Sequence, residues 1–91
     1  MATVIVPGML RDATGGRSRI FVEGATLKAV VRRLAEMYPR AAERLLDETG
    51  ELRHSVAIFV DGVEVKAADG LLFPVGPESE IVIAPAMSGG R

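Results

Sequence analysis

An amphipathic segment, residues 27–38, lies between strand-like segments on both sides and limits the folds open to this chain. Thr26 precedes it and is a favoured N-cap, whereas Pro39 follows it and cannot continue a helix. The apolar residues of the segment recur at helical spacing: Leu27, Val30, Val31, Leu34 and Tyr38. The sequence therefore predicts one main helix that buries a single face.

Short β-branched or alternating segments surround this helix. Turn signals at residues 14–16 and at Asp61-Gly62 predict two hairpins, one before the helix and one after it. Residues 41–46 predict a second, short helical piece, and residues 71–73 remain ambiguous between strand and turn. The predicted strands are residues 3–6, 18–22, 56–60, 63–65 and 80–84.

This order of elements predicts an α+β domain in which one mixed sheet packs on the main helix. A ferredoxin-like sandwich would need a second full helix late in the chain, and no helical pattern follows Val65. We therefore expect a β-grasp (ubiquitin-like) fold over residues 1–87, followed by a flexible diglycine tail at residues 88–91. The predicted core comprises Leu27, Val30, Val31, Leu34, Val56, Ile58, Val60, Ile81 and Ile83.

Charge and composition exclude several classes of function. The chain has 11 basic and 12 acidic residues, so its charge gives no reason to expect a nucleic-acid partner. It contains no apolar stretch of about 18 residues and no signal-peptide pattern, so we expect a cytoplasmic protein without a membrane partner. The absence of cysteine excludes disulfides, thiolate metal sites and sulfur carried on a side-chain thiol.

The final residues, Gly89-Gly90-Arg91, suggest a different place for chemistry. A diglycine backbone can enter a narrow channel that any Cβ would block. At the end of a chain it would make the terminal carboxylate itself a plausible substrate. The alternative is a frayed, glycine-rich terminus without function.

Other candidate sites have simpler explanations. His54 has no cysteine or second histidine with which to bind a metal, so a structural or surface role is expected. The acidic stretch at residues 47–51 lacks the ligand spacing of a calcium loop and predicts a solvated turn. Gly15-Gly16, between Arg11 and Arg17, resembles a phosphate cradle, but a hairpin turn explains these glycines.

Phe59 and Val82 are the candidate docking residues. If Val56, Ile58 and Val60 face the helix, strand alternation directs Phe59 to the opposite face of the sheet. Val82 lies in the same phase between Ile81 and Ile83. An exposed aromatic side chain beside a valine predicts part of a partner-docking patch. We add to this prediction the apolar joint before the diglycine, Pro85 and Met87.

The whole chain resembles the ubiquitin-like sulfur carriers, the group that contains the molybdopterin synthase small subunit and the thiamine sulfur carrier. Residues 56–65, 75–83 and 85–90 carry the likeness. Within the group, the chain is most similar to the actinobacterial carrier that supplies sulfur for cysteine synthesis. That comparison rests on residues 10–11, 14–16, 43–47 and 52–54. Two positions depart from the pattern: Ala57 replaces a frequent Asn, and Arg91 follows the diglycine.

The resemblance implies a carrier that is not an enzyme and has no cofactor of its own. An E1-like adenylating enzyme would use ATP to activate the carboxylate of Gly90, next to Gly89, and a sulfur donor would convert it to a thiocarboxylate. A sulfur-accepting synthase would then consume the sulfur. Because Arg91 blocks Gly90, a zinc peptidase is expected to remove it first.

Three alternatives remain open at this point. The chain could be the small subunit of molybdopterin synthase, which consumes the same thiocarboxylate inside an enzyme complex. It could be a ubiquitin-like modifier that forms isopeptide bonds with lysines. It could also be a β-grasp interaction module with an incidental diglycine, in which case Arg91 is a tolerated extension or a cloning remnant.

Overall fold

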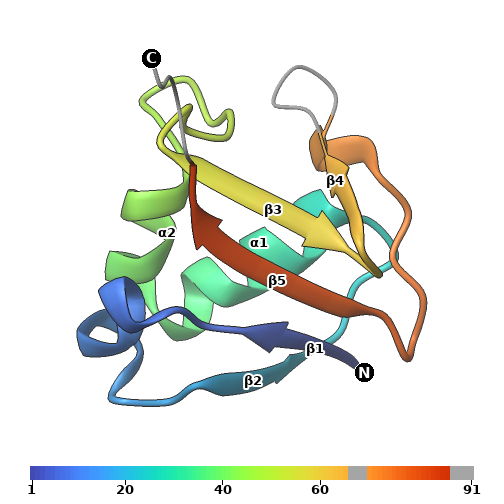
Figure 1. Ribbon diagram of the computed structural model, residues 1–91, viewed down its shortest axis with the longest axis horizontal. Coiled ribbons are helices and arrows are strands. Elements are labelled where there is room, and N and C mark those ends of the chain that lie inside the picture. Colours follow the sequence, from blue (N-terminus) through green and yellow to red (C-terminus); the bar gives the residue numbers. More distant parts are fainter. Residues whose placement is uncertain (66–69, 87–91) are drawn as a thin grey trace.

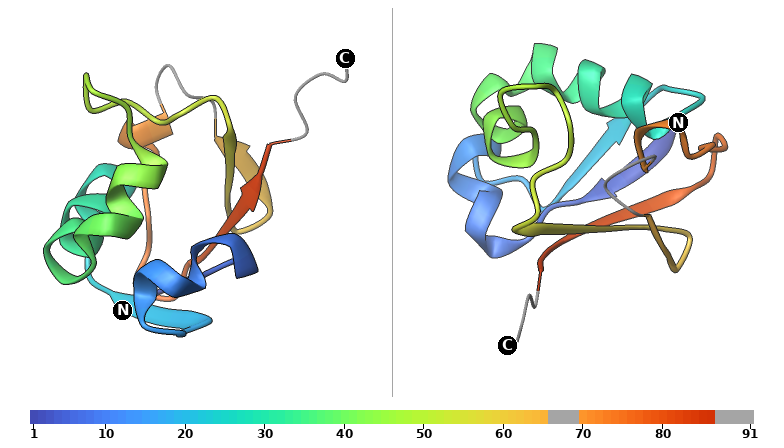
Figure 2. Two further views of the ribbon diagram at one scale, coloured as in Figure 1. Left: turned by 90° about the vertical axis from the view of Figure 1, so that its left-hand side faces the viewer. Right: turned by 90° about the horizontal axis from the view of Figure 1, so that it is seen from above.

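A computed structural model describes residues 1–65 and 70–86 of the chain. Among these residues, five strands form one mixed sheet in the order β2-β1-β5-β3-β4 (Figure 1). The helices pack on one face of the sheet, and the opposite face is left uncovered by the described elements (Figure 2, right). This architecture confirms the predicted α+β, β-grasp fold.

The first two strands form the predicted antiparallel pair. β1 (Ala2–Ile5) pairs with β2 (Arg19–Val22), and β1 also pairs in parallel with β5 (Glu80–Pro85) at the centre of the sheet. The connection from β1 to β2 is more than a turn, because it contains the 3-10 helix η1 (Gly8–Thr14). Gly15 and Gly16 follow η1 with positive φ, as the predicted turn required.

The main helix α1 (Leu27–Met37) begins where the sequence predicted. The side chain of Thr26 accepts a hydrogen bond from the backbone N–H of Ala29 at 3.2 Å, which caps the helix. Tyr38 ends α1, and Pro39 occupies the first turn of the short helix α2 (Pro39–Leu45). The predicted short helix therefore exists and begins two residues earlier than expected.

The second hairpin also follows the prediction. β3 (Val56–Val60) and β4 (Val63–Val65) are antiparallel and joined by Asp61-Gly62, with φ values of 51° and 84° at the two turn residues. The ambiguous segment after β4 is the 3-10 helix η2 (Gly70–Leu72) rather than a strand. β5 completes the sheet between β1 and β3.

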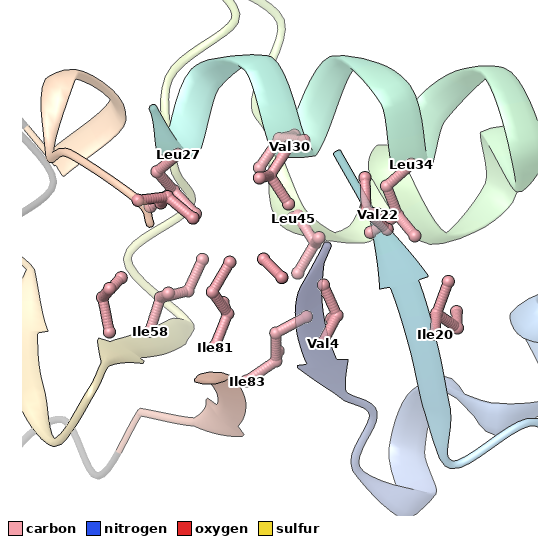
Figure 3. Close-up of a cluster of buried hydrophobic side chains, with 14 of the residues drawn as sticks. Val4, Ile20, Val22, Leu27, Val30, Leu34, Leu45, Ile58, Ile81 and Ile83 are labelled. Atoms are coloured by element: carbon pink, nitrogen blue, oxygen red, sulfur yellow. The ribbon is translucent and has the colours of Figure 1, made fainter. Parts of the chain in front are cut away.

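The core lies between the helices and the inner face of the sheet (Figure 3). Eight of the nine residues in the predicted core are buried, and Val56 is only half-buried. Val56 differs because it lies at the end of the sheet, where a groove opens beside it. The core also includes side chains that the prediction omitted: Val4, Val6, Leu10, Ile20, Val22 and Leu45.

Candidate functional site

The described chain ends in a backbone anchor at the end of two paired strands. Pro85, the last residue of β5, lies opposite Val56 of β3. The N–H of Ala86 then donates to the carbonyl of Ser55 at 2.9 Å. The predicted site residues beyond this anchor lie outside the described residues: Met87, Gly89, Gly90 and Arg91.

A row of five residues crosses the open face of the sheet, toward the viewer in Figure 1. Strand register places Ile5 beside Val82, and Val82 beside Phe59. Arg19 lies next to Ile5 at one end of the row, and Glu64 lies next to Phe59 at the other. This row therefore has an apolar centre, with a cationic side chain at one end and an anionic side chain at the other.

The predicted direction of Phe59 and Val82 is confirmed, since both alternate with buried residues and lie side by side. Their expected exposure was overestimated. Both side chains are half-buried, because each belongs to an inner strand with a neighbour on either side. Pro85, the third docking candidate in the described residues, is exposed at the end of β5.

Sequence analysis missed the part of this surface that comes from β1 and β2. Ile5 is half-buried between Arg19 and Val82 in the row, and Phe21 is 60% exposed on the edge strand β2. The signal was present, because Val4 and Val6 face the core and alternation then directs Ile5 outward.

A hydrogen-bonded carboxylate joins the β3–β4 turn to the start of β5. Asp61 accepts from the hydroxyl of Ser79 at 2.8 Å and from the N–H of Glu80 at 2.9 Å. The backbone N–H of Glu80 and the Ser79 hydroxyl hold the pKa of Asp61 below its usual value. These contacts fix the end of the sheet that is remote from the tail.

Among residues 1–65 and 70–86, two other carboxylates have shifted pKa values, and both have structural partners. The guanidinium of Arg44 donates to both oxygens of Asp12 at 3.0 Å and lowers the pKa of that carboxyl. Asp47 accepts from the hydroxyl of Thr49 at 2.6 Å and from two backbone N–H groups, which lowers its pKa. The second pattern is a polar turn, as predicted for this acidic stretch.

The part of the chain that the structure describes offers no assembled catalytic centre. Within it, no group of three or more His, Asp or Glu side chains could hold a metal ion. His54 is exposed, and the hydroxyls of Thr49 and Ser79 donate to carboxylates in turns rather than to a histidine. This arrangement can present a surface and a chain end to another protein.

Among residues 1–65 and 70–86, no helix has the length and apolar character that crossing a membrane requires.

Comparison with known proteins identifies the family. Residues 4–90 match the ThiS family. The sulfur carrier protein CysO of Mycobacterium tuberculosis is 36% identical over 90 residues, which cover 97% of each chain. Its crystal structure superposes with a TM-score of 0.88 at 34% identity, over 96% of this chain and 100% of that one.

Two further solved structures are similar. The Amycolatopsis orientalis BexX/CysO complex contains a chain with a TM-score of 0.88 at 28% identity, covering 99% of this chain and 100% of that one. Small archaeal modifier protein 1 of Methanosarcina acetivorans has a TM-score of 0.79 at 27% identity, over 98% and 95% of the two chains. The family match spans nearly the whole sequence, and the chain therefore belongs to the ThiS family and is a sulfur carrier rather than an enzyme.

Proposed function

We propose that this carrier holds sulfur as a thiocarboxylate on Gly90 and donates it for cysteine synthesis. The observation that supports this most is the match to the ThiS family, which extends to residue 90 and so includes the diglycine but not Arg91. The likeness to CysO over nearly the full length favours this branch of the family. The fold contributes a docking surface beside the strand that leads toward the diglycine.

The proposed chemistry takes place on a partner enzyme. The Gly90 carboxylate attacks the α-phosphorus of ATP, and pyrophosphate leaves as the acyl adenylate forms. Hydrosulfide from a sulfur donor attacks the acyl carbon, AMP leaves with the electron pair of the broken C–O bond, and the S–H proton is lost to water. The resulting thiocarboxylate sulfur then displaces the leaving group of an activated acceptor and forms a thioester. Water hydrolyses the acyl C–S bond, which releases the sulfur-containing product and restores the Gly90 carboxylate. No described side chain of the carrier is needed as acid, base or metal ligand.

Docking is assigned to the open face of the sheet. Val82 and Phe59 contribute half-buried apolar surface at its centre, and Ile5 extends this surface toward β2. An enzyme that covers this face removes apolar area from water while its active site receives the tail. Pro85 and Met87 are assigned to the rim of the same contact, between the sheet and Gly90.

Gly90 becomes reactive only after Arg91 is removed. With Arg91 attached, the Gly90 carbonyl is part of a peptide bond and cannot be adenylated as a carboxylate. A channel shaped for two glycines also excludes a long cationic side chain. We assign this hydrolysis to a zinc peptidase, in which metal-activated water cleaves the bond.

Intact-mass measurement of the protein purified from its native cells tests this function. The proposal expects a species that ends at Gly90 with one carboxyl oxygen replaced by sulfur. Supplying a cysteine synthase and an activated serine derivative should join the serine-derived group to that species through sulfur, and hydrolysis of the adduct should then release cysteine and return the carboxylate. A native protein that retains Arg91 in every molecule and never carries sulfur would contradict the proposal.

A second candidate is protein modification, which the likeness to small archaeal modifier protein 1 favours. In that case the activated Gly90 would form an isopeptide bond with a lysine of another protein. The two functions can be distinguished in digested native lysate, by a mass-spectrometric search for lysines that carry the carrier's C-terminal residues. Abundant conjugates without any thiocarboxylate would favour modification. Production of molybdopterin with a large synthase subunit would instead favour the molybdopterin alternative.

A further inference from the structure

A groove is lined by residues of η1, of α2 and of the segment that enters β3. Figure 2 (left) shows these elements at the end of the molecule where β5 ends. The volume of the groove is about 420 Å³. Leu10 and Val56 supply buried and half-buried apolar surface, and Met9 lies on one side with 43% of its surface exposed. The charged residues Glu43, Arg44 and Arg53 also line the groove.

One wall of this groove is held in place by Arg44. Its guanidinium binds both carboxylate oxygens of Asp12 at 3.0 Å and also donates to the carbonyl of Met9 at 2.8 Å. These bonds connect α2 to η1 through residues that are 32 and 35 positions apart in the sequence. The groove is therefore formed before any partner binds, and Arg44 is already committed to the fold.

Arg53 is also oriented by a hydrogen bond to a backbone carbonyl, but among the described residues no carboxylate forms a salt bridge with it. Its Nε donates to the carbonyl of Glu43 at 3.0 Å, which fixes the plane of the guanidinium. Among residues 1–65 and 70–86, neither terminal nitrogen of Arg53 has a hydrogen-bond or salt-bridge partner. The charge of Arg53 contributes to the lowered pKa of Asp47, and that carboxylate already accepts bonds from Thr49 and Glu51. The exposed Glu43 lines the same groove but forms no salt bridge with Arg53 among the described residues. Arg53 thus offers two N–H groups to a planar anion.

The groove lies close to the start of the tail. Ser55 lines it, and the carbonyl of Ser55 binds the N–H of Ala86. Gly90 is four residues beyond Ala86, so a fully extended chain places it no more than about 14 Å away. An enzyme whose active site binds Gly90 therefore lies within reach of this end of the carrier.

We propose that this groove receives an anchor from the enzyme that takes up the tail, consisting of an apolar side chain next to an Asp or Glu. The apolar side chain packs against Met9 and Val56, and the carboxylate binds the free side of the Arg53 guanidinium. The anchor rests on the proposed function, because it requires an enzyme to act on Gly90. It supplies a second contact, separate from the open face of the sheet around Phe59.

The test measures binding of the carrier ending at Gly90 to the adenylating enzyme of the same organism, by calorimetry, together with thiocarboxylate formation. Arg53→Glu is expected to weaken binding about tenfold or more. Arg53→Lys, which keeps the charge but loses the planar fork, should give an intermediate loss. Arg32→Glu is the matched control, because it reverses an exposed charge on α1, away from the groove.

Met9→Asp provides an independent variant if Arg53→Glu perturbs the fold, since the half-exposed Met9 side chain makes no internal polar contact. It places a carboxylate beside the incoming one and removes the apolar wall, so a similar loss is expected. If the Arg53→Glu and Met9→Asp variants both bind the adenylating enzyme as tightly as the Arg32→Glu control does, the proposed anchor is wrong. If the wild-type carrier binds the enzyme but never gains sulfur, the proposed function is wrong. The anchor, which requires an enzyme that acts on Gly90, is then wrong as well.

Discussion

Replacing Ile58 with alanine tests the assignment of the two faces of the sheet. Ile58 is 2% exposed and lies between Ile83 and Val65 in strand register. The change removes three side-chain carbons, which at about 0.8 kcal/mol for each buried methylene amounts to about 2.4 kcal/mol. The cavity that remains adds to this loss, so we expect Ile58→Ala to destabilise the fold by roughly 3–4 kcal/mol, within the usual range for such changes.

Urea and thermal unfolding measure this loss. A domain of 91 residues typically has a free energy of unfolding of about 5–14 kcal/mol, so the variant should remain folded at 25 °C. Each kcal/mol lowers the Tm of a domain of this size by about 4–8 °C, so the loss predicts a decrease of roughly 12–32 °C. A decrease below about 4 °C would show that Ile58 is not in the core.

The neighbouring residue is the matched control. Phe59 lies on the open face and is half-buried, so Phe59→Ala should lower the Tm by clearly less than Ile58→Ala. The same variant should weaken binding to the adenylating enzyme by more than about 1 kcal/mol. Equal destabilisation by the two changes would contradict the face assignment, and unchanged affinity would place the docking surface elsewhere.

Two further predictions concern local contacts. Thr26→Ala removes the cap bond to the N–H of Ala29 and should cost about 1 kcal/mol in urea unfolding, whereas Thr26→Ser should restore most of it. The lowered pKa of Asp61 means that its contacts to Ser79 and Glu80 stabilise the fold fully above its ordinary value of 3.8 and are lost as pH falls through the lower value in the folded state. Asp61→Asn should therefore flatten the decline in stability on the acid side, and identical pH profiles for the two proteins would refute this.

Local signals in the sequence were sufficient for most of the fold. Thr26 marks the start of the main helix and Pro39 marks its end, because capping and the missing N–H of proline act within one helical turn. Asp61-Gly62 fixed the second hairpin because a tight turn of this type needs positive φ at both positions. These features depend on neighbours in the chain and were confirmed.

The features that sequence analysis missed depend on residues far apart in the chain. The salt bridge between Arg44 and Asp12 spans 32 residues and holds η1 against α2. No local sequence pattern predicts this salt bridge. The hydroxyl of Ser79 binds Asp61 across 18 residues in the same way. The groove at the tail end arises from such contacts, so it became visible only in the folded molecule.

Conversion of Gly90 to a thiocarboxylate is the most direct test of the central claim. The full chain and a chain that ends at Gly90 are each incubated with ATP, the adenylating enzyme and a sulfur donor, and their intact masses are measured. We predict that only the shorter chain gains sulfur, and that the full chain does so after a zinc peptidase has removed Arg91. Equal conversion of both forms with Arg91 still attached, or no conversion of either, would contradict the account.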